Sequence, residues 1–321
     1  MCAQAAIKLN PLLRNGAYGI VMRGVQKCTR GCSSLRGRNM LPLCCIKLDT
    51  ATDPACGSGN FLTETYLSLR RLENEIISAI YDEQLVSTFL DPIQVSISQF
   101  HGIEINDFAV SVAKTALWIA ESQMMRETEA IVHMSLDFLP LKTNANIVEG
   151  NALQLDWESV VPKYRLNYIM GNPPFVGARI MSPEQKTDVT KVFSDWKNAG
   201  NLDYVCCWYK KAADLMRGTG IRAALVSTNS VSQGECVAIL WKPLFESGVH
   251  IDFAYRTFRW DSEAKIKAHV HCVIIGFSIA PYSGKKFIFT GEQTQEAQNI
   301  NGYLLNADNV FIESRRLPLS R

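Results

Sequence analysis

The sequence has no long hydrophobic run and no strong excess of charge. Its best apolar stretch, VHCVIIGF at 270–277, has the length of a strand, whereas a membrane-spanning helix needs about 18 consecutive apolar residues. A net charge of +2 over 321 residues is too small to indicate nucleic-acid binding, so a local groove would have to supply positive charge. With 47% hydrophobic and 20% charged residues, the composition excludes a wholly disordered or fibrous chain. We expect a globular protein without a membrane partner.

Acidic residues are absent from residues 1–48. Eight basic residues fall in this stretch: Lys8, Arg14, Arg23, Lys27, Arg30, Arg36, Arg38 and Lys47. Removing these eight from the 33 basic residues leaves 25 against 31 acidic residues, so the rest of the chain carries a net charge of −6. Turn formers interrupt the stretch, and no helical or strand periodicity is sustained. Residues 1–50 are therefore predicted to be a separate basic, cysteine-rich segment that is foreign to the following domain or poorly ordered.

The cysteines of this segment leave other interpretations open. Five of the ten cysteines lie there: Cys2, Cys28, Cys32, Cys44 and Cys45. An organellar transit peptide is one alternative, because such segments are basic and poor in acidic residues. A zinc site made by the last four cysteines is another, but the adjacent pair and the missing CxxC pairs argue against it, so no metal site is predicted. Ten irregularly placed cysteines without a secretory signal indicate reduced thiols and a cytoplasmic protein.

From residue 49 onward, short apolar runs alternate with helical patterns. The runs are SQFHGIEIN (98–106), NANIVEGNAL (144–153), LNYIMGNPPF (166–175), IRAALVST (221–228), HIDFAYRTF (250–258) and AHVHCVIIGF (268–277). Helical spacing follows the turn cluster at 53–60 and recurs at about 202–217, and Asn106 or Asp107 can cap a helix between them. Strands that alternate with helices are typical of β-α units with a mostly parallel sheet, so the predicted fold class is α/β.

Glycines and a carboxylate follow the first predicted strands, where open α/β sheets bind their ligands. Gly57 and Gly59 would let the backbone approach a ligand closely, as no residue with a Cβ could. Their GxG lacks the third glycine of a dinucleotide-binding fingerprint, and no GxxxxGK[ST] loop supports triphosphate hydrolysis. Glu104 ends a strand and could accept both hydroxyls of a ribose, but a solvated strand end explains a lone glutamate equally well.

The most informative motif is NPPF at 172–175. Two prolines stiffen the backbone after a buried strand, and the first removes an N–H and leaves carbonyls free to accept hydrogen bonds. Asn172 adds a side-chain carbonyl, and Phe175 offers an aromatic face. This set suits a planar ring with an exocyclic amine, because two acceptors meet its two N–H donors and one face stacks. In isolation, the motif would be explained equally by a stiff turn with a core phenylalanine.

Taken together, DPACGSGNF and the downstream GNPPF resemble the adenine-N6 DNA methyltransferases that use S-adenosylmethionine. The order of the motifs, cofactor loop first, is similar to the gamma arrangement. FHGIEIN and VEGNAL resemble further cofactor strands, and LDYVCCWYKKAADLM, ALVSTNSVSQGE and FAYRTFRWDSEAKIKAHVHCVIIGF resemble later motifs of type IIG restriction-modification enzymes. The resemblance covers roughly residues 52–321 in one consistent order, so chance agreement is improbable.

The resemblance assigns a role to each matching residue. It implies that Asp53 binds the methionine amino group of the cofactor, that Glu104 holds the ribose hydroxyls and that Asn151 receives the adenine amine. The backbone around Ala55, Gly57 and Gly59 would pack against the same cofactor. Catalysis would rest on the NPPF motif: Asn172, Pro173, Pro174 and Phe175. Asn172 and the Pro173 carbonyl would bind the amine of the target adenine, and Phe175 would stack on the extruded base, with Phe258 or Trp260 as weaker contacts.

The implied fold is a Rossmann-like class I methyltransferase with a mostly parallel seven-stranded sheet and helices on both faces. The implied organisation is a catalytic domain at 51–280 and a connector at 281–321. The implied activity is transfer of a methyl group from S-adenosylmethionine to the N6 amine of a flipped adenine in double-stranded DNA, within restriction-modification or related phage defence. A methyltransferase of protein glutamine or RNA, and a catalytically inactive remnant, are the alternatives. Phe175 in place of tyrosine favours DNA.

Two departures from the family pattern bear on this expectation. The strand before the cofactor loop should be a clean apolar run, yet KLDTAT precedes Asp53. The resemblance also implies truncation at both ends, with the target-recognition and nuclease domains separate or missing. Each good bidentate contact to a base edge supplies about 1–3 kcal/mol of discrimination, and such contacts need a recognition domain. We therefore expect weak DNA binding that falls steeply with salt and shows no preferred site.

Overall fold

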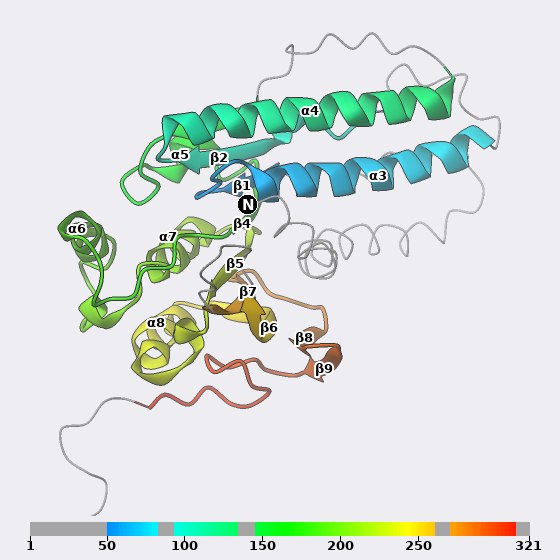
Figure 1. Cartoon of the computed structure of the whole chain (residues 1–321). Coiled ribbons are helices and arrows are strands. Elements are labelled where there is room, and N and C mark those ends of the chain that lie inside the picture. Colours follow the sequence, from blue (N-terminus) through cyan, green and yellow to red (C-terminus); the bar gives the residue numbers. More distant parts are fainter. Residues whose placement is uncertain (1–49, 83–92, 134–144, 261–269, 313–321) are drawn as a thin grey trace, which may run out of the picture. The chain divides into compact units, whose positions relative to one another are not determined.

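The computed structural model describes residues 50–82, 93–133, 145–260 and 270–312 (Figure 1). The segment 1–49, with its basic residues and the cysteines considered for zinc, lies outside these residues. The chain divides into two compact units, Met1–Asn151 (unit 1) and Ala152–Arg321 (unit 2). Each unit is described by itself.

Unit 1 contains three parallel strands in the order β3-β2-β1, with bounds β1 Thr50–Asp53, β2 Phe100–Glu104 and β3 Asn146–Glu149. All four residues of β1 are buried, including both threonines. Residues 50–53 thus form a strand without being wholly apolar, because the β-branched threonine side chains suit an extended backbone, while residues 47–49 lie outside the described part of the chain. The register aligns Asp53 with Gly102, so the carboxyl ends of β1 and β2 lie at the same edge.

Two long helices connect these strands and pack against each other (Figure 1). Their bounds are α3 Asn60–Asp82 and α4 Asp107–Val132, and the short 3-10 helix η3, Ile97–Gln99, precedes β2. Asn106 caps α4, because its side chain accepts a hydrogen bond from the Ala109 N–H at 3.0 Å. The predicted cap is therefore confirmed. No helix in the described part of the chain is both long and apolar enough to span a bilayer.

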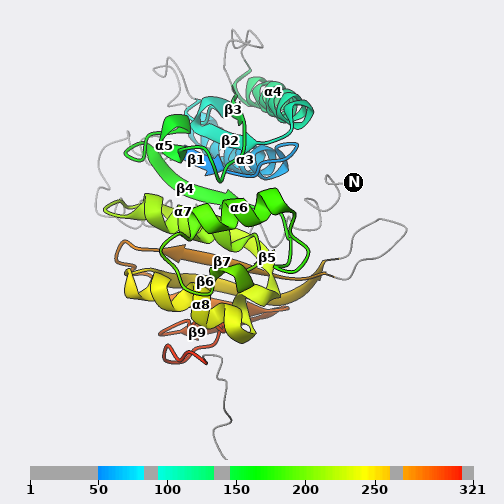
Figure 2. The same cartoon turned by 90° about the vertical axis from the view of Figure 1, so that its left-hand side faces the viewer.

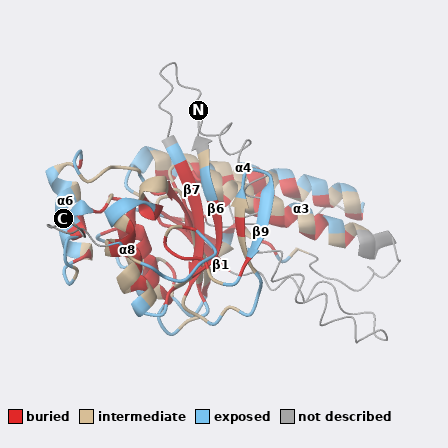
Figure 3. Ribbon diagram, turned by 90° about the horizontal axis from the view of Figure 1, so that it is seen from below, coloured by how far each residue is buried: buried red, intermediate tan, exposed pale blue. Residues whose placement is uncertain are grey.

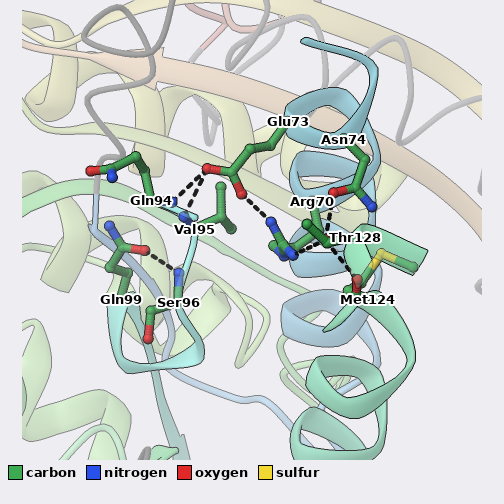
Figure 4. A network of polar contacts seen from close by, with 9 residues as sticks. All are labelled: Arg70, Glu73, Asn74, Gln94, Val95, Ser96, Gln99, Met124 and Thr128. Atoms are coloured by element: carbon green, nitrogen blue, oxygen red, sulfur yellow. Dashed lines mark hydrogen bonds and ion pairs between the residues drawn. The ribbon is translucent and has the colours of Figure 1, made fainter. Parts of the chain in front are cut away.

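A buried polar network lies between α3 and α4 (Figure 4). Arg70 forms an ion pair with Glu73 and donates a hydrogen bond to the Thr128 hydroxyl at 2.7 Å, and all three side chains are fully buried. The other oxygen of Glu73 accepts hydrogen bonds from the backbone N–H groups of Gln94 and Val95 at 2.6 and 3.2 Å. This network ties both helices to the segment that leads into β2.

The sheet of unit 2 has the strand order β4-β5-β7-β6-β8-β9 in the described residues (Figure 2). The bounds are β4 Leu166–Gly171, β5 Arg222–Thr228, β6 His250–Trp260, β7 Val270–Ser278, β8 Lys286–Thr290 and β9 Gln293–Ala297. β4 and β5 are parallel, whereas β7 is antiparallel to both of its neighbours. β7 is largely buried and β9 largely exposed, so the core lies around the middle strands (Figure 3).

Helices α7 and α8 pack against each other in unit 2. The bounds are α5 Trp157–Val160, α6 Pro183–Val192, η4 Ala199–Asn201, α7 Cys206–Met216, η5 Asn229–Ser232 and α8 Gly234–Glu246. The hydroxyl groups of Tyr209 in α7 and Ser227 in β5 share a hydrogen bond of 2.7 Å. The side chain of Trp241 in α8 donates to the Val231 carbonyl in η5 at 2.8 Å. These buried bonds hold the two helices on the sheet.

The predicted α/β class is confirmed. The parallel pairs are β1-β2, β2-β3, β4-β5 and β6-β8, so parallel pairing predominates in the described sheet. In these residues the seven expected strands correspond to β1–β7, and the chain adds β8 and β9 within the segment predicted to be a connector.

Candidate active site

The turn after β1 is built around a buried carboxylate. Asp53 ends β1, its side chain is only 1% exposed, and its Oδ1 accepts a hydrogen bond from the Ala55 N–H at 3.0 Å. Burial raises the pKa of Asp53 to about 7, since the charged form loses its hydration. The Ala55 N–H opposes this shift, and the nearby charge of Glu104 adds to it. Near neutral pH the Asp53 carboxyl group is therefore present in both its protonated and its ionised form.

The two glycines of this turn are needed for different reasons. Gly57 and Gly59 both have positive φ, 54° and 80°, a conformation that disfavours residues with a Cβ. A Cβ on Gly59 would also lie 3.0 Å from the Cβ of Ala113 in α4, so Gly59 permits close packing of turn and helix. A Cβ on Gly57 would meet nothing within 4 Å, so that side of the turn is open. Both glycines therefore lie in the turn that the sequence predicted after the first strand, with backbone angles that favour glycine.

Glu104 connects this turn to the start of α4. Its Oε2 accepts a hydrogen bond from the Gly57 N–H at 2.9 Å, and its Oε1 accepts one from the Asn106 N–H at 3.0 Å. The side chain is half-buried, and each carboxylate oxygen keeps a further lone pair for a ligand. Both oxygens of Glu104 therefore bind backbone N–H groups, one in the turn after β1 and one before α4.

Asn151 follows β3 beside this arrangement. The preceding Gly150 donates its N–H to the Glu104 carbonyl at 2.8 Å, and Asn151 is half-buried. Two residues that the sequence analysis did not single out flank Glu104 on the solvent side. Ile105 and Phe108 are large apolar side chains that are 68% and 75% exposed. Their exposure depends on the position of α4, which no local sequence pattern indicates.

The NPPF motif of unit 2 follows β4 directly. Pro173 is buried, Pro174 is exposed, and Phe175 is half-buried. The Oδ1 atom of Asn172 is buried and accepts no hydrogen bond from any residue that the structure describes. A buried carbonyl oxygen without a donor costs about 1–3 kcal/mol of stability, so such atoms are rare in native structures. The motif therefore holds an acceptor in a position that costs stability.

The segment after NPPF is fixed by Asp203 and Tyr204. The Asp203 carboxylate accepts hydrogen bonds from the Ala178 N–H at 3.2 Å and from the Ser230 hydroxyl in η5. The Tyr204 N–H donates to the Val176 carbonyl at 2.9 Å. Asp203 therefore links the segment after the motif to η5, which follows β5. No local sequence pattern indicates this role of Asp203, since Asp203 and Ala178 are 25 residues apart in sequence.

Several other candidates can be placed only in part. Phe258 lies in β6, Trp260 ends that strand without a described side chain, and His271 is exposed on β7. Lys265, Lys267 and His269 lie outside the described residues. Among the described side chains, no group of three His, Cys, Asp or Glu residues is placed to bind a metal ion.

The predicted residues therefore form two groups. Asp53, the turn with Gly57 and Gly59, and Glu104 come together in unit 1, with Asn151 next to the Gly150–Glu104 hydrogen bond. Asn172, Pro173, Pro174 and Phe175 form one continuous segment directly after β4 in unit 2.

Comparison with known proteins identifies the family. A family model described as MmeI, DNA-methyltransferase domain, matches residues 44–290. DNA methyltransferase A of Bacillus subtilis (strain 168) is 42% identical over 271 residues, which cover 84% of this chain and 31% of that protein. A solved structure of the type IIL restriction-modification enzyme MmeI in complex with DNA matches with a TM-score of 0.82 and 38% identity. That match covers 99% of this chain and 42% of the MmeI chain.

A more distant structure shares the fold alone. The type IIG restriction endonuclease BpuSI matches with a TM-score of 0.50 and 12% identity, over 76% of this chain and 24% of that chain. The chain thus spans less than half the length of the relatives it matches. The family model and the B. subtilis relative both cover most of this chain, in agreement with the resemblance of its motifs. This chain belongs to the family of MmeI-type DNA-methyltransferase domains.

Proposed function

We propose that this protein transfers a methyl group from S-adenosylmethionine to the N6 amine of an adenine in DNA, as part of a restriction-modification or related defence system. The observation that carries the proposal is the buried Oδ1 of Asn172 in the NPPF motif, which has no hydrogen-bond donor among the residues that the structure describes. An acceptor held ready in a water-poor site is what an incoming amine donor requires. The family membership supports DNA as the substrate, because MmeI has been solved in complex with DNA.

The residues of unit 1 fit the proposed cofactor. Asp53 is a buried carboxylate suited to the methionine ammonium group, and Glu104 retains lone pairs for two ribose hydroxyls. The open side of Gly57 leaves room for a ligand against the backbone, and the exposed Ile105 offers an apolar contact for a purine. Asn151 is the residue we assign to the adenine amine. When bound, S-adenosylmethionine supplies a methyl group that is already activated by its sulfonium.

The residues of unit 2 fit the proposed acceptor. An adenine amine is a poor nucleophile, because its lone pair is delocalised into the ring. The Asn172 Oδ1 and the Pro173 carbonyl would accept its two N–H donors, which favours a pyramidal nitrogen and localises the lone pair. Pro174 stiffens the turn, and Phe175 would stack on the extruded base. This chain's residues thus orient the amine and stabilise the positive charge that develops on it.

Extrusion of the base brings its own cost. The target atom lies within the duplex, so the base must leave the stack at a cost of a few kcal/mol. Sequence selection by base-edge contacts would come from a target-recognition domain, and cleavage from a nuclease domain, whether in the same chain or separate. The relatives extend well beyond the length matched here, which is consistent with such additional domains.

Two other functions make different predictions. A methyltransferase of protein glutamine or of RNA would use the same amide geometry, because those substrates also present a planar amine. An inactive remnant would fold but bind no cofactor. The family membership favours DNA over both.

The test has two stages. Calorimetry with S-adenosylmethionine on the 321-residue chain should detect binding, and its absence would favour the remnant. Labelled methyl transfer is then measured with DNA, RNA and protein, and the methylated product is identified by mass spectrometry. We expect N6-methyladenine from DNA and none from DNA whose adenines are already N6-methylated. Label in RNA or protein without label in DNA would overturn the assignment.

A further inference from the structure

A short turn immediately after the NPPF motif presents an apolar and a cationic side chain to solvent. The wedge turn, residues 177–180, is closed by a hydrogen bond from the Ile180 N–H to the Gly177 carbonyl at 3.0 Å. Ile180 is 78% exposed, more than any other aliphatic side chain among the exposed large hydrophobic residues described. Its neighbour Arg179 is exposed as well, and no described residue forms an ion pair with it. A single exposed apolar side chain is ordinary by itself, but Ile180 is distinguished by its place beside Arg179, directly after the NPPF motif and on a fixed support.

The chain before the tip is held in place. The Tyr204 N–H binds the Val176 carbonyl at 2.9 Å, and the Asp203 carboxylate binds the Ala178 N–H at 3.2 Å. Asp203 also accepts hydrogen bonds from the hydroxyl groups of Thr228 and Ser230, so the support reaches the end of β5. The wedge turn is thus fixed to the same framework as the NPPF turn.

The chain after the tip is fixed as well. Met181 is buried, and Ser182 caps α6 through a capping box with Gln185, followed by Pro183 in the first turn. α6 is anchored by Asp188, which is buried and accepts hydrogen bonds from Tyr204 and Gln154 at 2.9 Å each. Ile180 is therefore exposed on a rigid support.

We propose that the wedge turn enters the DNA duplex at the extruded adenine, with Ile180 filling the space that the base leaves and Arg179 contacting a phosphate. Proteins that unstack DNA insert apolar side chains between base steps, and a rigid support lets such a side chain act as a wedge. The wedge turn begins two residues after Phe175, so the residues that would bind the extruded base are close to it in sequence. This inference rests on the proposed function, because it takes DNA as the partner.

The first experiment tests the contact without requiring activity. Ile180 is replaced by the photo-crosslinking residue p-benzoylphenylalanine, and the exposed Ile119 of α4 is replaced in a matched control. Each protein is irradiated at low salt with a 30-base-pair duplex in which one adenine lies opposite an abasic site. We expect crosslinks from position 180 within one or two nucleotides of that adenine. Equal crosslinking from both positions, or crosslinks from position 180 only to a second protein copy, would overturn the proposal.

The second experiment tests the wedge through the cost of extrusion. Ile180→Ala should lower methyl transfer to fully paired DNA at least about tenfold. The free-energy change that corresponds to a tenfold loss is smaller than the cost of unstacking one base step. With the target adenine opposite an abasic site, the defect should shrink to within about twofold, because extrusion is then easier. Ile180→Leu should retain most of the transfer. The affinity for S-adenosylmethionine, measured by calorimetry, should not change in either variant.

The outcomes separate the two proposals. An equal loss on paired and unpaired targets would mean that Ile180 acts on folding or on catalysis, and the wedge would be wrong. If the unmodified chain transfers no methyl group to any DNA, the proposed function fails, and the photo-crosslinks still decide the wedge. Arg179→Ala tests the phosphate contact, because losing one such contact reduces the slope of log K against log salt by about 0.9. An unchanged slope would remove Arg179 from the proposal.

Discussion

The candidate polar groups of the two units differ in their hydrogen bonding. In unit 1, both oxygens of Glu104 already bind backbone N–H groups, and Asp53 binds the Ala55 N–H. In unit 2, the Oδ1 of Asn172 is buried without a donor among the described residues. A group that binds a ligand in its ground state can already form hydrogen bonds to the protein before the ligand arrives. A group that must stabilise a transition state gains from being left unpaired until the substrate arrives.

The strongest way to break this comparison is to remove the unpaired acceptor. Asn172→Ala should reduce methyl transfer about 10²-fold or more, the scale seen for loss of a preorganised polar contact. Cofactor affinity measured by calorimetry should stay nearly the same, because Asn172 belongs to unit 2. Asn172→Asp keeps an acceptor oxygen and should lose less activity, while Ala at the exposed Asn201 is a matched control. Unchanged turnover in Asn172→Ala would disprove the assigned role.

Removal of the satisfied carboxylate should produce a smaller effect of the other kind. Glu104→Ala should weaken S-adenosylmethionine binding by roughly 1–3 kcal/mol, the scale of a lost charge-assisted hydrogen bond. Glu149 ends the neighbouring strand opposite Glu104 and is exposed, so Glu149→Ala is a close control that should leave affinity unchanged. Equal affinities of the two variants in calorimetry would show that the ribose assignment is wrong.

The raised pKa of Asp53 makes unit 1 sensitive to pH. Only the ionised carboxylate binds an ammonium group, so cofactor affinity should fall about fivefold from pH 7 to pH 6 if its pKa is about 7. Asp53→Asn should bind more weakly at pH 8 and lose this dependence. Asp195→Asn, at an exposed site in unit 2, should keep the pH dependence of cofactor affinity. An unaltered pH profile in Asp53→Asn would assign the titration to another group.

The same shift predicts an effect on folding. The pKa of Asp53 is higher in the folded than in the unfolded state, so ionisation of this group opposes folding as pH rises through about 7. Asp53→Asn should therefore increase the free energy of unfolding at pH 8, by about 1.4 kcal/mol per unit of pKa elevation. Urea denaturation at pH 5 and pH 8 measures this gain, which should be smaller at the lower pH.

The smallest expected effect concerns the support of the NPPF turn. Tyr204→Phe removes the hydrogen bond to the buried Asp188 and should lower the free energy of unfolding by about 1–2 kcal/mol. The affinity for S-adenosylmethionine should not change, since both residues belong to unit 2. Tyr164→Phe, at an 84% exposed tyrosine, should leave stability unaltered in urea denaturation. A loss of cofactor affinity in Tyr204→Phe would mean that the two units are coupled.

Local patterns predicted the fold class and the strand ends at which the candidate site residues lie. Gly57, Gly59 and Glu104 follow parallel strands, whose carboxyl ends meet at one edge of a sheet, so short sequence motifs located them. Asp203 could not be found this way, because it binds Ala178 from 25 residues away and no local periodicity marks that return. The exposed Ile105 could not be found either, since its exposure depends on where α4 packs. The hairpin of β8 and β9 was missed because its second strand is mostly polar.

The buried ion pair between Arg70 and Glu73 within α3 constrains how this protein can change over generations. Removing one member of a buried pair leaves an uncompensated charge and costs about 3–5 kcal/mol, a large share of the stability of a domain. Replacement of Arg70 alone, or of Glu73 alone, therefore passes through a form that folds poorly. Joint replacement of both residues by apolar residues of similar volume would leave no uncompensated charge. This site is accordingly expected to vary among descendants only by paired substitutions.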